Sequence, residues 1–363
     1  MPPAVRIHRL PESGLLGQSY SWGLEMKHLV LAAAAATMLF GAQAEGRDTI
    51  RIMSSESHFP YTAMVGESFA SNYRQPTPII ERTTARSSTR SFCAGVGHEF
   101  PDIIGIPRRM WNAEFKECQE NGVSRITEIK VGYDGIVLVG APDGPVVRPT
   151  KAQIFQALAK RLVVDGELVD NPHRRWNEIH DSLPDMPIRV IGPLVNTDPA
   201  NAFLLEVMDT GCRKIEAMAR LPEEVRDPAC VSLRNDDVFE SVSKSYDEAV
   251  RLVHAREHQL AVMPFSFYEI HADSLALHPI DGVLPDEQSI AMGEYPVICT
   301  LFIYVKVQHY EQVPGILEFV TEYTSDRAWG PDGYLVNLGM IPMSHADRID
   351  QRSNAIGLNP MWR

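Results

Sequence analysis

The sequence is poor in positive charge and lacks the short motifs that mark several large protein classes. Its 363 residues include 34 Lys and Arg against 47 Asp and Glu, which gives a formal net charge of −13. This balance argues against nucleic acid binding over a broad surface, whereas a small anion site depends only on local charge. No CxxC pair, G-x-S-x-G pattern, internal repeat or low-complexity tract occurs. The sequence therefore predicts an ordinary globular protein without a cofactor or metal.

Only one stretch, residues 26–44, combines a basic start with a long apolar run: MKHLVLAAAAATMLFGAQA. Lys27 begins it, and the small-x-small pattern at 42–44 is typical of a cleavage site. The uncharged run is too short to span the ~30 Å core of a membrane comfortably. We therefore expect a cleaved secretory signal, a mature chain beginning at Glu45 without a membrane anchor, and a mis-assigned extension at 1–25.

The five cysteines are expected to lie in an oxidising compartment, because the chain is predicted to be exported. Cys93 and Cys118 flank one short segment, and Cys212 and Cys230 flank another. Two local disulfides with Cys299 left over form the most economical pairing, which the sequence alone does not establish. Each loop closure would stabilise the fold by about 3 kcal/mol.

Short β-branched runs alternate with longer amphipathic stretches along the mature chain. Strands are predicted at 49–53, 102–106, 135–140, 188–192, 260–264 and 300–306, with helices at 61–74, 109–121, 150–160, 199–217, 240–255 and 311–325. This alternation predicts α/β sheets with crossover connections. Two apolar segments, 132–139 and 293–305, look like crossings between lobes. They predict a first lobe of 45–138 plus 294–363 and a second lobe of 139–293.

Several words in this layout point to a known family: FCAGVG (92–97), EIKVGYDGIVLV (128–139), DGELVDNPHRRWNEI (165–179), GEYPV (293–297) and PGILEFV (314–320). In this order, they resemble the periplasmic phosphate-binding proteins of ABC-type phosphate importers. The resemblance implies a two-lobed α/β fold of the type II periplasmic-binding-protein class. Each lobe would be a mixed, mostly parallel sheet flanked by helices, with the ligand cleft at the hinge. It also implies a monomeric, non-enzymatic periplasmic protein that delivers a small polar solute to an ABC importer permease.

Members of that family hold phosphate between the lobes with helix N-terminal amides, hydroxyls and a few charged side chains. In the family, four short sequence segments supply these contacts, and each is called a contact word here. The first corresponds to Ser55, Glu56, Ser57 and His58. The second word, normally a serine and glycines that open a helix, falls on Ala85, Arg86, Ser87 and Ser88. Glycine allows backbone amides to approach an anion closely, and the chain has none at these positions.

The two remaining contact words depart from the family pattern as well. The third is Pro107-Arg108, in which proline removes an amide donor. The fourth keeps a hydroxyl at Thr197 and has Asp198 at a position that glycine usually takes. A carboxylate about 4 Å from a buried anion costs several kcal/mol at an effective dielectric constant near 20. The sequence therefore predicts a retained scaffold around an altered anion site.

The candidate ligand contacts are Ser55, Glu56, Ser57, His58, Arg86, Ser87, Ser88, Arg108, Thr197 and Asp198. The solute is either phosphate, with Arg86 and Arg108 offsetting the acids, or a small solute with an acidic part and a cationic or hydroxyl-rich part. Structural roles are open at several positions. Asp198 would serve equally as the N-cap of its own helix, Glu56 and Arg108 as surface charges, and His58 as a packed core residue.

Three other functions are weighed against solute binding. HAREH (254–258) matches the H-x-x-E-H pattern of zinc-protease helices, but the predicted helix ends near Ala255. A phosphatase or esterase would need a nucleophile with a base, and the nearby Ser55, Ser57 and His58 lack a supporting motif. A sensory or interaction protein on the same scaffold, without a transported solute, is the main alternative.

Overall fold

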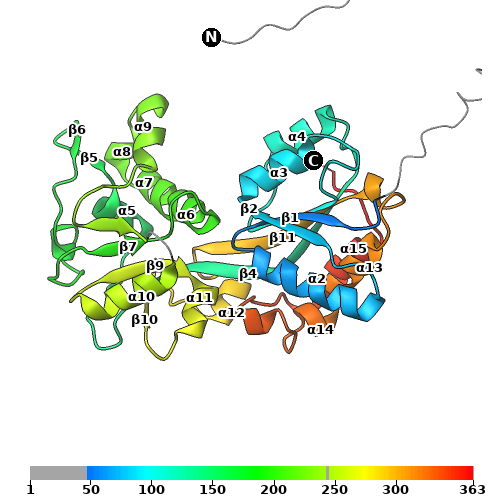
Figure 1. The fold of residues 1–363 in the computed structure, drawn as a ribbon. Coiled ribbons are helices and arrows are strands. Elements are labelled where there is room, and N and C mark those ends of the chain that lie inside the picture. The colour runs from blue at the N-terminus through cyan, green and yellow to red at the C-terminus, as the bar shows by residue number, and fades with distance from the viewer. Residues whose placement is uncertain (1–46, 243–244, 363) are drawn as a thin grey trace, which may run out of the picture. The chain divides into compact units, whose positions relative to one another are not determined.

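The structure, a computed structural model, describes residues 47–242 and 245–362. The predicted signal at 26–44 and the upstream residues 1–25 lie outside the described residues. The described residues form one unit of two lobes joined by long strands (Figure 1). Among the described helices, none is both long and apolar enough to cross a membrane.

The first lobe is built from the N-terminal part of the described chain and the C-terminal part. Its first elements are β1 (Arg51–Ser55), α2 (Phe59–Tyr73), β2 (Ile79–Thr83), α3 (Ala85–Cys93), β3 (Ile103–Ile106) and α4 (Asn112–Glu120). The chain leaves along β4 (Ile126–Gly140) and returns along β11 (Ile298–Lys306). The lobe is completed by η3 (Val307–His309), α13 (Ile316–Tyr323), α14 (Asp326–Trp329), η4 (Val336–Leu338) and α15 (His345–Ile356).

The second lobe contains the elements between β4 and β11. It opens with α5 (Lys151–Leu158), the hairpin β5 (Arg161–Val164) and β6 (Glu167–Asp170), η1 (Trp176–Glu178) and β7 (Val190–Gly192). A helical run follows: α6 (Asp198–Ala202), the π-helix η2 (Phe203–Asp209), α7 (Thr210–Arg213), α8 (Glu216–Ala219) and α9 (Glu223–Cys230). The lobe ends with β8 (Phe239–Ser241), α10 (Tyr246–Ala255), β9 (Leu260–Pro264), α11 (Phe265–Ile270), β10 (Ala276–His278) and α12 (Glu287–Ala291).

The long strand β4 links the sheets of the two lobes. The strand order is β2-β1-β3-β11-β4-β9-β7-β8, with β10 also paired to β4. Strands β2, β1 and β3 are parallel, as are β8, β7 and β9, while the pairs that involve β4 or β11 are antiparallel. Residues 126–135 of β4 pair with β11, and 136–139 pair with β9. The predicted crossings at 132–139 and 293–305 thus fall on β4 and on the chain entering and forming β11. Each lobe is the expected mixed, mostly parallel sheet.

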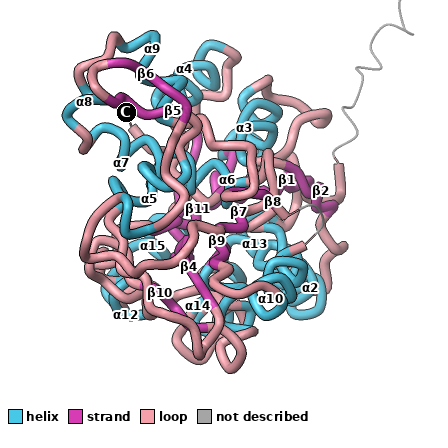
Figure 2. The backbone as a smooth tube through the Cα atoms, turned by 90° about the vertical axis from the view of Figure 1, so that its left-hand side faces the viewer, coloured by secondary structure: helices cyan, strands magenta, loops and turns pink. Residues whose placement is uncertain are grey.

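Helices cover the sheets (Figure 2). The apolar core of the second lobe is one cluster, and that of the first lobe is divided into two. In the first lobe, Phe69 and Phe319 meet at a ring distance of 5.7 Å where α2 packs against α13. In the second, Phe155 and Trp176 are buried in a cluster of their own. Separate cores allow the lobes to behave as two bodies connected through β4 and β11.

Helix α3 forms from a stretch that lacks the apolar residues of a typical helix, so its sequence pattern does not predict a helix. Thr84 is its N-cap, accepting a hydrogen bond from the Ser87 amide at 3.2 Å. Its buried face has the spacing of a helix facing a core, but three of the five side chains are small: Ala85, Ser88, Thr89, Phe92 and Cys93. Arg86 and Arg90 are exposed on the other side.

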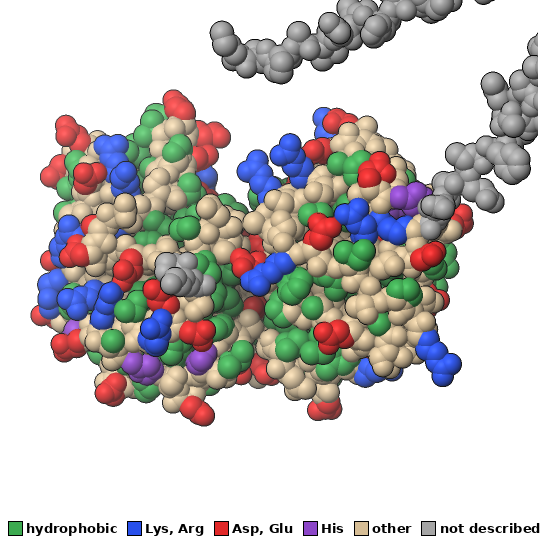
Figure 3. All heavy atoms as spheres, viewed as in Figure 1, with side chains coloured by type: hydrophobic (Ala, Val, Ile, Leu, Met, Phe, Trp, Pro, Cys, Tyr) green, Lys and Arg blue, Asp and Glu red, His purple; other side chains and the backbone are tan. Residues whose placement is uncertain are grey.

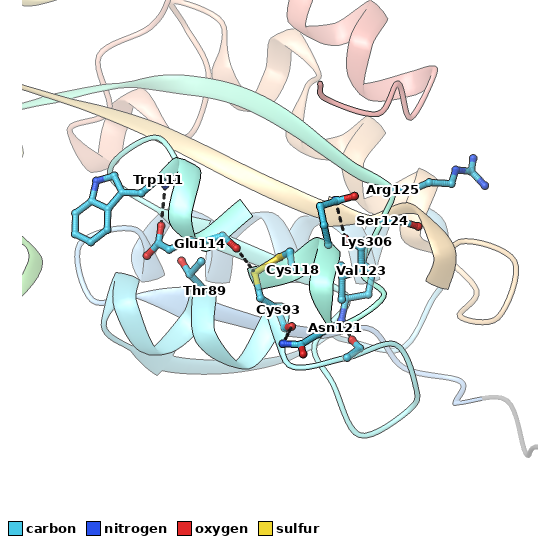
Figure 4. Close-up of a disulfide and its surroundings, with 12 residues drawn as sticks. Thr89, Cys93, Trp111, Glu114, Cys118, Asn121, Val123, Ser124, Arg125 and Lys306 are labelled. Carbon is cyan, nitrogen blue, oxygen red and sulfur yellow. Dashed lines mark hydrogen bonds between the residues drawn. A yellow bond between two sulfur atoms is a disulfide. The ribbon is translucent and has the colours of Figure 1, made fainter. Parts of the chain in front are cut away.

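Both local disulfides are present, and each ties helices within one lobe. Cys93 at the end of α3 is bonded to Cys118 of α4, as Figure 4 shows. The Asn121 amide donates to the carbonyl of Cys93 at 2.9 Å and closes the same corner. Cys212 of α7 is bonded to Cys230 of α9. Cys299 is a buried free thiol on β11.

Candidate functional site

A cleft of about 910 Å³ lies between the two lobes. Its first wall comes from α3, the loop after β3, β4 and β11, and its second from α6, η2 and the residue after α9. Figure 3 shows the furrow where the lobes meet. The lining mixes charges with large apolar side chains, chiefly Arg86, Arg108, Arg109, Trp111, Lys130, Tyr133, Asp198, Leu204, Leu205, Glu206 and Phe302.

Asp198 spans the cleft and binds the N-terminus of α3. Its Oδ1 accepts the Ala85 backbone N–H at 3.0 Å, in a buried contact between residues 113 positions apart. A helix N-terminus carries unsatisfied N–H groups and a partial positive charge, so it attracts anions. Thr197 is the N-cap of α6, because its Oγ1 accepts from the Ala200 amide at 3.4 Å. The alternative in which Asp198 caps its own helix is therefore wrong.

The Asp198 carboxyl is only 5% exposed. Burial raises its pKa above the ordinary value, while the Ala85 N–H, the nearby Ser55 hydroxyl and the charge of Arg108 oppose this rise. Its second oxygen, Oδ2, is buried and has no hydrogen-bond partner among the described residues. A buried carboxylate oxygen without a hydrogen-bond donor is costly. Asp198 is therefore the least satisfied group at the bottom of the cleft, which is called the floor from here on.

Asn196 sets up this arrangement from the preceding turn. Its φ of 61° lies in the left-handed region, which Asn adopts more readily than most residues. The chain then enters α6, with Thr197 capping the helix and Asp198 in its first turn. Both residues of the fourth contact word therefore have defined roles: one hydroxyl starts the helix and one carboxylate reaches the opposite lobe.

The turn after β1 contributes two hydroxyls close to Asp198. Ser55 and Ser57 lie 3.5 Å apart, Oγ to Oγ. Ser57 also lines a small enclosed cavity together with Asp198. Glu56 pairs with Arg82 at 2.5 Å on the partly exposed side of the turn. The negative charge of Glu56 still raises the pKa of Asp198, so it lies near the floor without lining the cleft.

His58 points into the core of the first lobe. Its side chain is fully buried, and Nδ1 lies 3.1 Å from the Thr62 hydroxyl. Its backbone N–H donates to the Ser55 carbonyl at 3.0 Å, within the turn. Burial lowers the pKa of His58 to about 3, so the ring is neutral. A Cβ on Gly105 would lie 2.6 Å from Nδ1, which shows that β3 keeps a glycine to make room for this ring.

Of the second contact word, Arg86 faces the cleft and the two serines do not line it. Ser87 is exposed, and its hydroxyl accepts from Thr84 at 3.1 Å. Ser88 is buried beneath α3, and its hydroxyl has no hydrogen-bond partner among the described residues. The side chain of Arg86 is exposed and forms no ion pair with any described carboxylate.

The other cations of the first wall are already paired. Arg108 binds both oxygens of Glu114 at 2.8 and 2.6 Å and lies 3.8 Å above the Trp111 ring. Arg109 pairs with Glu128 at 2.9 Å. Lys130 lies 3.8 Å from the Asp347 carboxylate and 3.1 Å from the Tyr133 hydroxyl. These pairs fix the wall, and within the described part of the chain they leave Arg86 as its unpaired cation.

Sequence reasoning missed most of the second wall. The stretch predicted as one helix over 199–217 contains a π-helix, from which Leu204, Leu205 and Glu206 line the cleft. π-helical segments are rare and often occur at functional sites. No residue pattern in the stretch 199–217 predicts one. Trp111 could have been found, because it follows the predicted Arg108 turn by three residues.

A second buried carboxyl, Asp134, lies on β4 where the strand passes between the lobes. It accepts hydrogen bonds from the Gly135 amide at 2.7 Å, the Ser266 amide at 3.0 Å and the Ser266 hydroxyl at 2.8 Å. Burial raises its pKa. Together with Asp198 and Ser57, it lines a cavity of about 10 Å³ beneath the cleft. Two acidic residues therefore lie at the floor, although the surface of the cavity itself is almost entirely apolar.

No described residues form a cluster of metal-ligand type. The H-x-x-E-H pattern fails as a zinc helix because α10 ends at Ala255. His258 has a φ of 59° in the turn before β9. The two histidines therefore do not share a helical face, and the zinc alternative has no structural basis.

Comparisons with known proteins agree on the fold. Residues 41–327 match the family model of the PBP superfamily domain. Protein SphX of Synechocystis sp. is 21% identical over 322 residues, covering 85% of this chain and 83% of that protein. Two solved structures superpose over most of the chain. A "possible phosphate binding protein" from Planctomyces limnophilus has a TM-score of 0.60 at 20% identity, covering 85% of this chain and 98% of the other. An ABC-type phosphate transport receptor from Vibrio cholerae has a TM-score of 0.58 at 14% identity, covering 80% and 99%.

Proposed function

Since the chain belongs to the PBP superfamily, we propose that it is the periplasmic solute-binding component of an ABC importer. Its cleft takes a small organic solute in place of inorganic phosphate. The importer role is proposed because the fold is similar to that of proteins such as the Vibrio cholerae phosphate transport receptor. The change of solute rests on the residues of this cleft.

The contact between Asp198 and the Ala85 amide carries the second part of the proposal. The family resemblance places phosphate at this helix N-terminus, and here a carboxylate of the protein occupies it. A dianion about 4 Å from an ionised carboxylate would be opposed by several kcal/mol at an effective dielectric constant near 20. The surrounding positions also lack the glycines that bring amides close to an anion. Inorganic phosphate therefore fits this floor poorly.

The size and lining of the cleft support an organic solute. At about 910 Å³, it falls within the range of small-molecule pockets. Trp111 is 51% exposed and Leu205 is 45% exposed, and both line the cleft. Exposed large apolar side chains gathered in a concave site are typical of ligand pockets. An inorganic anion would leave these surfaces in water.

Binding would act through closure of the two lobes about β4 and β11. Closing expels water, so hydrogen bonds and ion pairs to the solute form in a lower dielectric. The solute would stabilise the closed arrangement only to the extent that it contacts both walls. In this cleft, the partners are Arg86 on the first wall and Asp198 with the π-helix on the second.

A thermal-shift screen with small organic acids, amines and zwitterions tests this function on the purified mature chain. A solute that binds only the folded chain raises the melting temperature, and the shift grows with the logarithm of its concentration once that exceeds the dissociation constant. The variant Leu205→Arg, which fills the cleft, should lose the shift. The matched variant Val225→Arg, at a residue on α9 that does not line the cleft and is 41% exposed, should retain it. If no solute shifts the melting temperature, the interaction-protein alternative is favoured instead.

A further inference from the structure

The acids of the cleft lie on its floor and on its second wall, which Glu206 lines, and its unpaired cation among the described residues lies on the first wall. The floor holds two buried carboxyls, Asp134 and Asp198, and the first wall holds the unpaired Arg86. The positions of these charges bear on the chemical class of the solute. That inference rests on the proposed function.

The floor is built to receive a donor that bears positive charge. The enclosed cavity of about 10 Å³ shares Pro107, Asp198 and Cys299 with the cleft, so it lies directly beneath it. No Lys, Arg or His lines this cavity. Oδ2 of Asp198 has no hydrogen-bond partner among the described residues, and Ser57 lines the same cavity. An ammonium group has three donors and no acceptor, so it would supply the donor that Oδ2 lacks.

The nearest cation does not satisfy Asp198. Arg108 lies close enough to lower the pKa of that carboxyl. Its guanidinium is nevertheless engaged with both oxygens of Glu114 and stacked on Trp111. The charge of Arg108 therefore offsets part of the Asp198 charge from a distance, and Oδ2 of Asp198 still has no hydrogen bond among the described residues. A ligand that brings its own N–H donor would complete the site.

Arg86 supplies the complementary position. It directly follows Ala85 in the first turn of α3, so it lies on the opposite wall from the π-helix and next to the contact that Asp198 makes. Guanidinium groups bind carboxylates and phosphonates through two parallel N–H donors. Trp111 and Leu204 line the same cleft and provide apolar surface for a short carbon chain.

We propose that the solute is a small organic zwitterion, whose ammonium group binds Asp198 above the enclosed cavity and whose acid group binds Arg86. The two lobes then each contribute one charge of opposite sign. An acid without the amine would face the Asp198 carboxylate, and an amine without the acid would leave Arg86 unpaired.

Isothermal titration calorimetry with matched probes tests this proposal. The zwitterions are 2-aminoethylphosphonate and β-alanine. Ethylphosphonate and propionate lack the amine, and ethylamine lacks the acid. We expect at least one zwitterion to bind about tenfold or more tightly than its partner without the amine, a difference of roughly 1.4 kcal/mol. Comparing phosphonate with carboxylate identifies the acid group.

Variants locate the two charges. Asp198→Asn keeps an oxygen that can accept the Ala85 N–H, so it should fold. It should also remove the preference for the zwitterion, while the exposed control Asp332→Asn retains it. Arg86→Gln should weaken zwitterion and matched acid about equally. Arg90→Gln, in the last turn of the same helix and outside the cleft, should weaken neither.

Equal affinity with and without the amine, or a preference that survives Asp198→Asn in a variant with an unchanged near-UV spectrum, overturns the zwitterion assignment. Either result leaves the solute-binding role intact. Failure of all five probes to bind also overturns the assignment. The proposed function is then judged separately by the wider thermal-shift screen.

Discussion

The two walls of the cleft are anchored alike and charged oppositely. Each begins with a threonine N-cap, Thr84 for α3 and Thr197 for α6. Each is tied at its far end by a local disulfide to a following helix. The first wall is a regular α-helix that presents Arg86, whereas the second passes into a π-helix that presents leucines and Glu206. The anchoring is thus common to both lobes, and the side chains facing the cleft differ.

Removing either disulfide should have the largest effect on stability. The bonds close segments of 25 and 18 residues, for which the chain-entropy account gives about 3 kcal/mol each. Cys93→Ser with Cys118→Ser, and Cys212→Ser with Cys230→Ser, should therefore lower the free energy of unfolding by similar amounts in urea titrations. A loss confined to one pair would show that the two walls are not anchored alike.

Removing a helix cap should have a smaller effect. Thr84→Ala and Thr197→Ala each delete a hydroxyl that accepts a backbone N–H, at 3.2 and 3.4 Å respectively. Each should cost about 1 kcal/mol in the same titrations. Thr197→Ala should also weaken solute binding, because α6 carries Asp198. An unchanged affinity for the solute identified in the screen would mean that the cap does not position this carboxylate.

The pH dependence of stability should reveal the acidic floor. Burial raises the pKa of Asp134 above 3.8 in the folded state, so the folded chain holds this proton more tightly than the unfolded chain. The free energy of unfolding of the wild type, relative to Asp134→Asn, should therefore fall as the pH rises from 3.8 through the raised pKa. It should then level off. A relative stability that rises over this interval would show that the ionised form is favoured in the fold.

Much of the scaffold could be predicted from the sequence, because its strands and most of its helices are marked by strong apolar periodicity. Helix α3 escaped prediction because its buried face uses Ala85, Ser88 and Thr89, which give little apolar signal. The π-helix escaped because its residues also fit an ordinary helix. Arg86 and Asp198, which the resemblance implies as ligand contacts, both line the cleft, and their roles in binding stay predictions.

The hydrogen bond between Asp198 and the Ala85 backbone N–H could not be predicted from local sequence. Ala85 and Asp198 are 113 positions apart, and their bond depends on how the two lobes meet. The side chain of His58 is fully buried, as the packed-core alternative at that position predicted. The solute contacts of the other residues in the contact words stay predictions.

Titration of the wild-type chain with inorganic phosphate tests the central claim most directly, because Asp198 occupies the helix N-terminus that phosphate would need. Calorimetry at constant ionic strength, with sulfate as the comparison anion, is the appropriate measurement. The account predicts no saturable heat for phosphate up to millimolar concentrations. Saturable binding of phosphate with a micromolar dissociation constant, unchanged in Asp198→Asn, would contradict it.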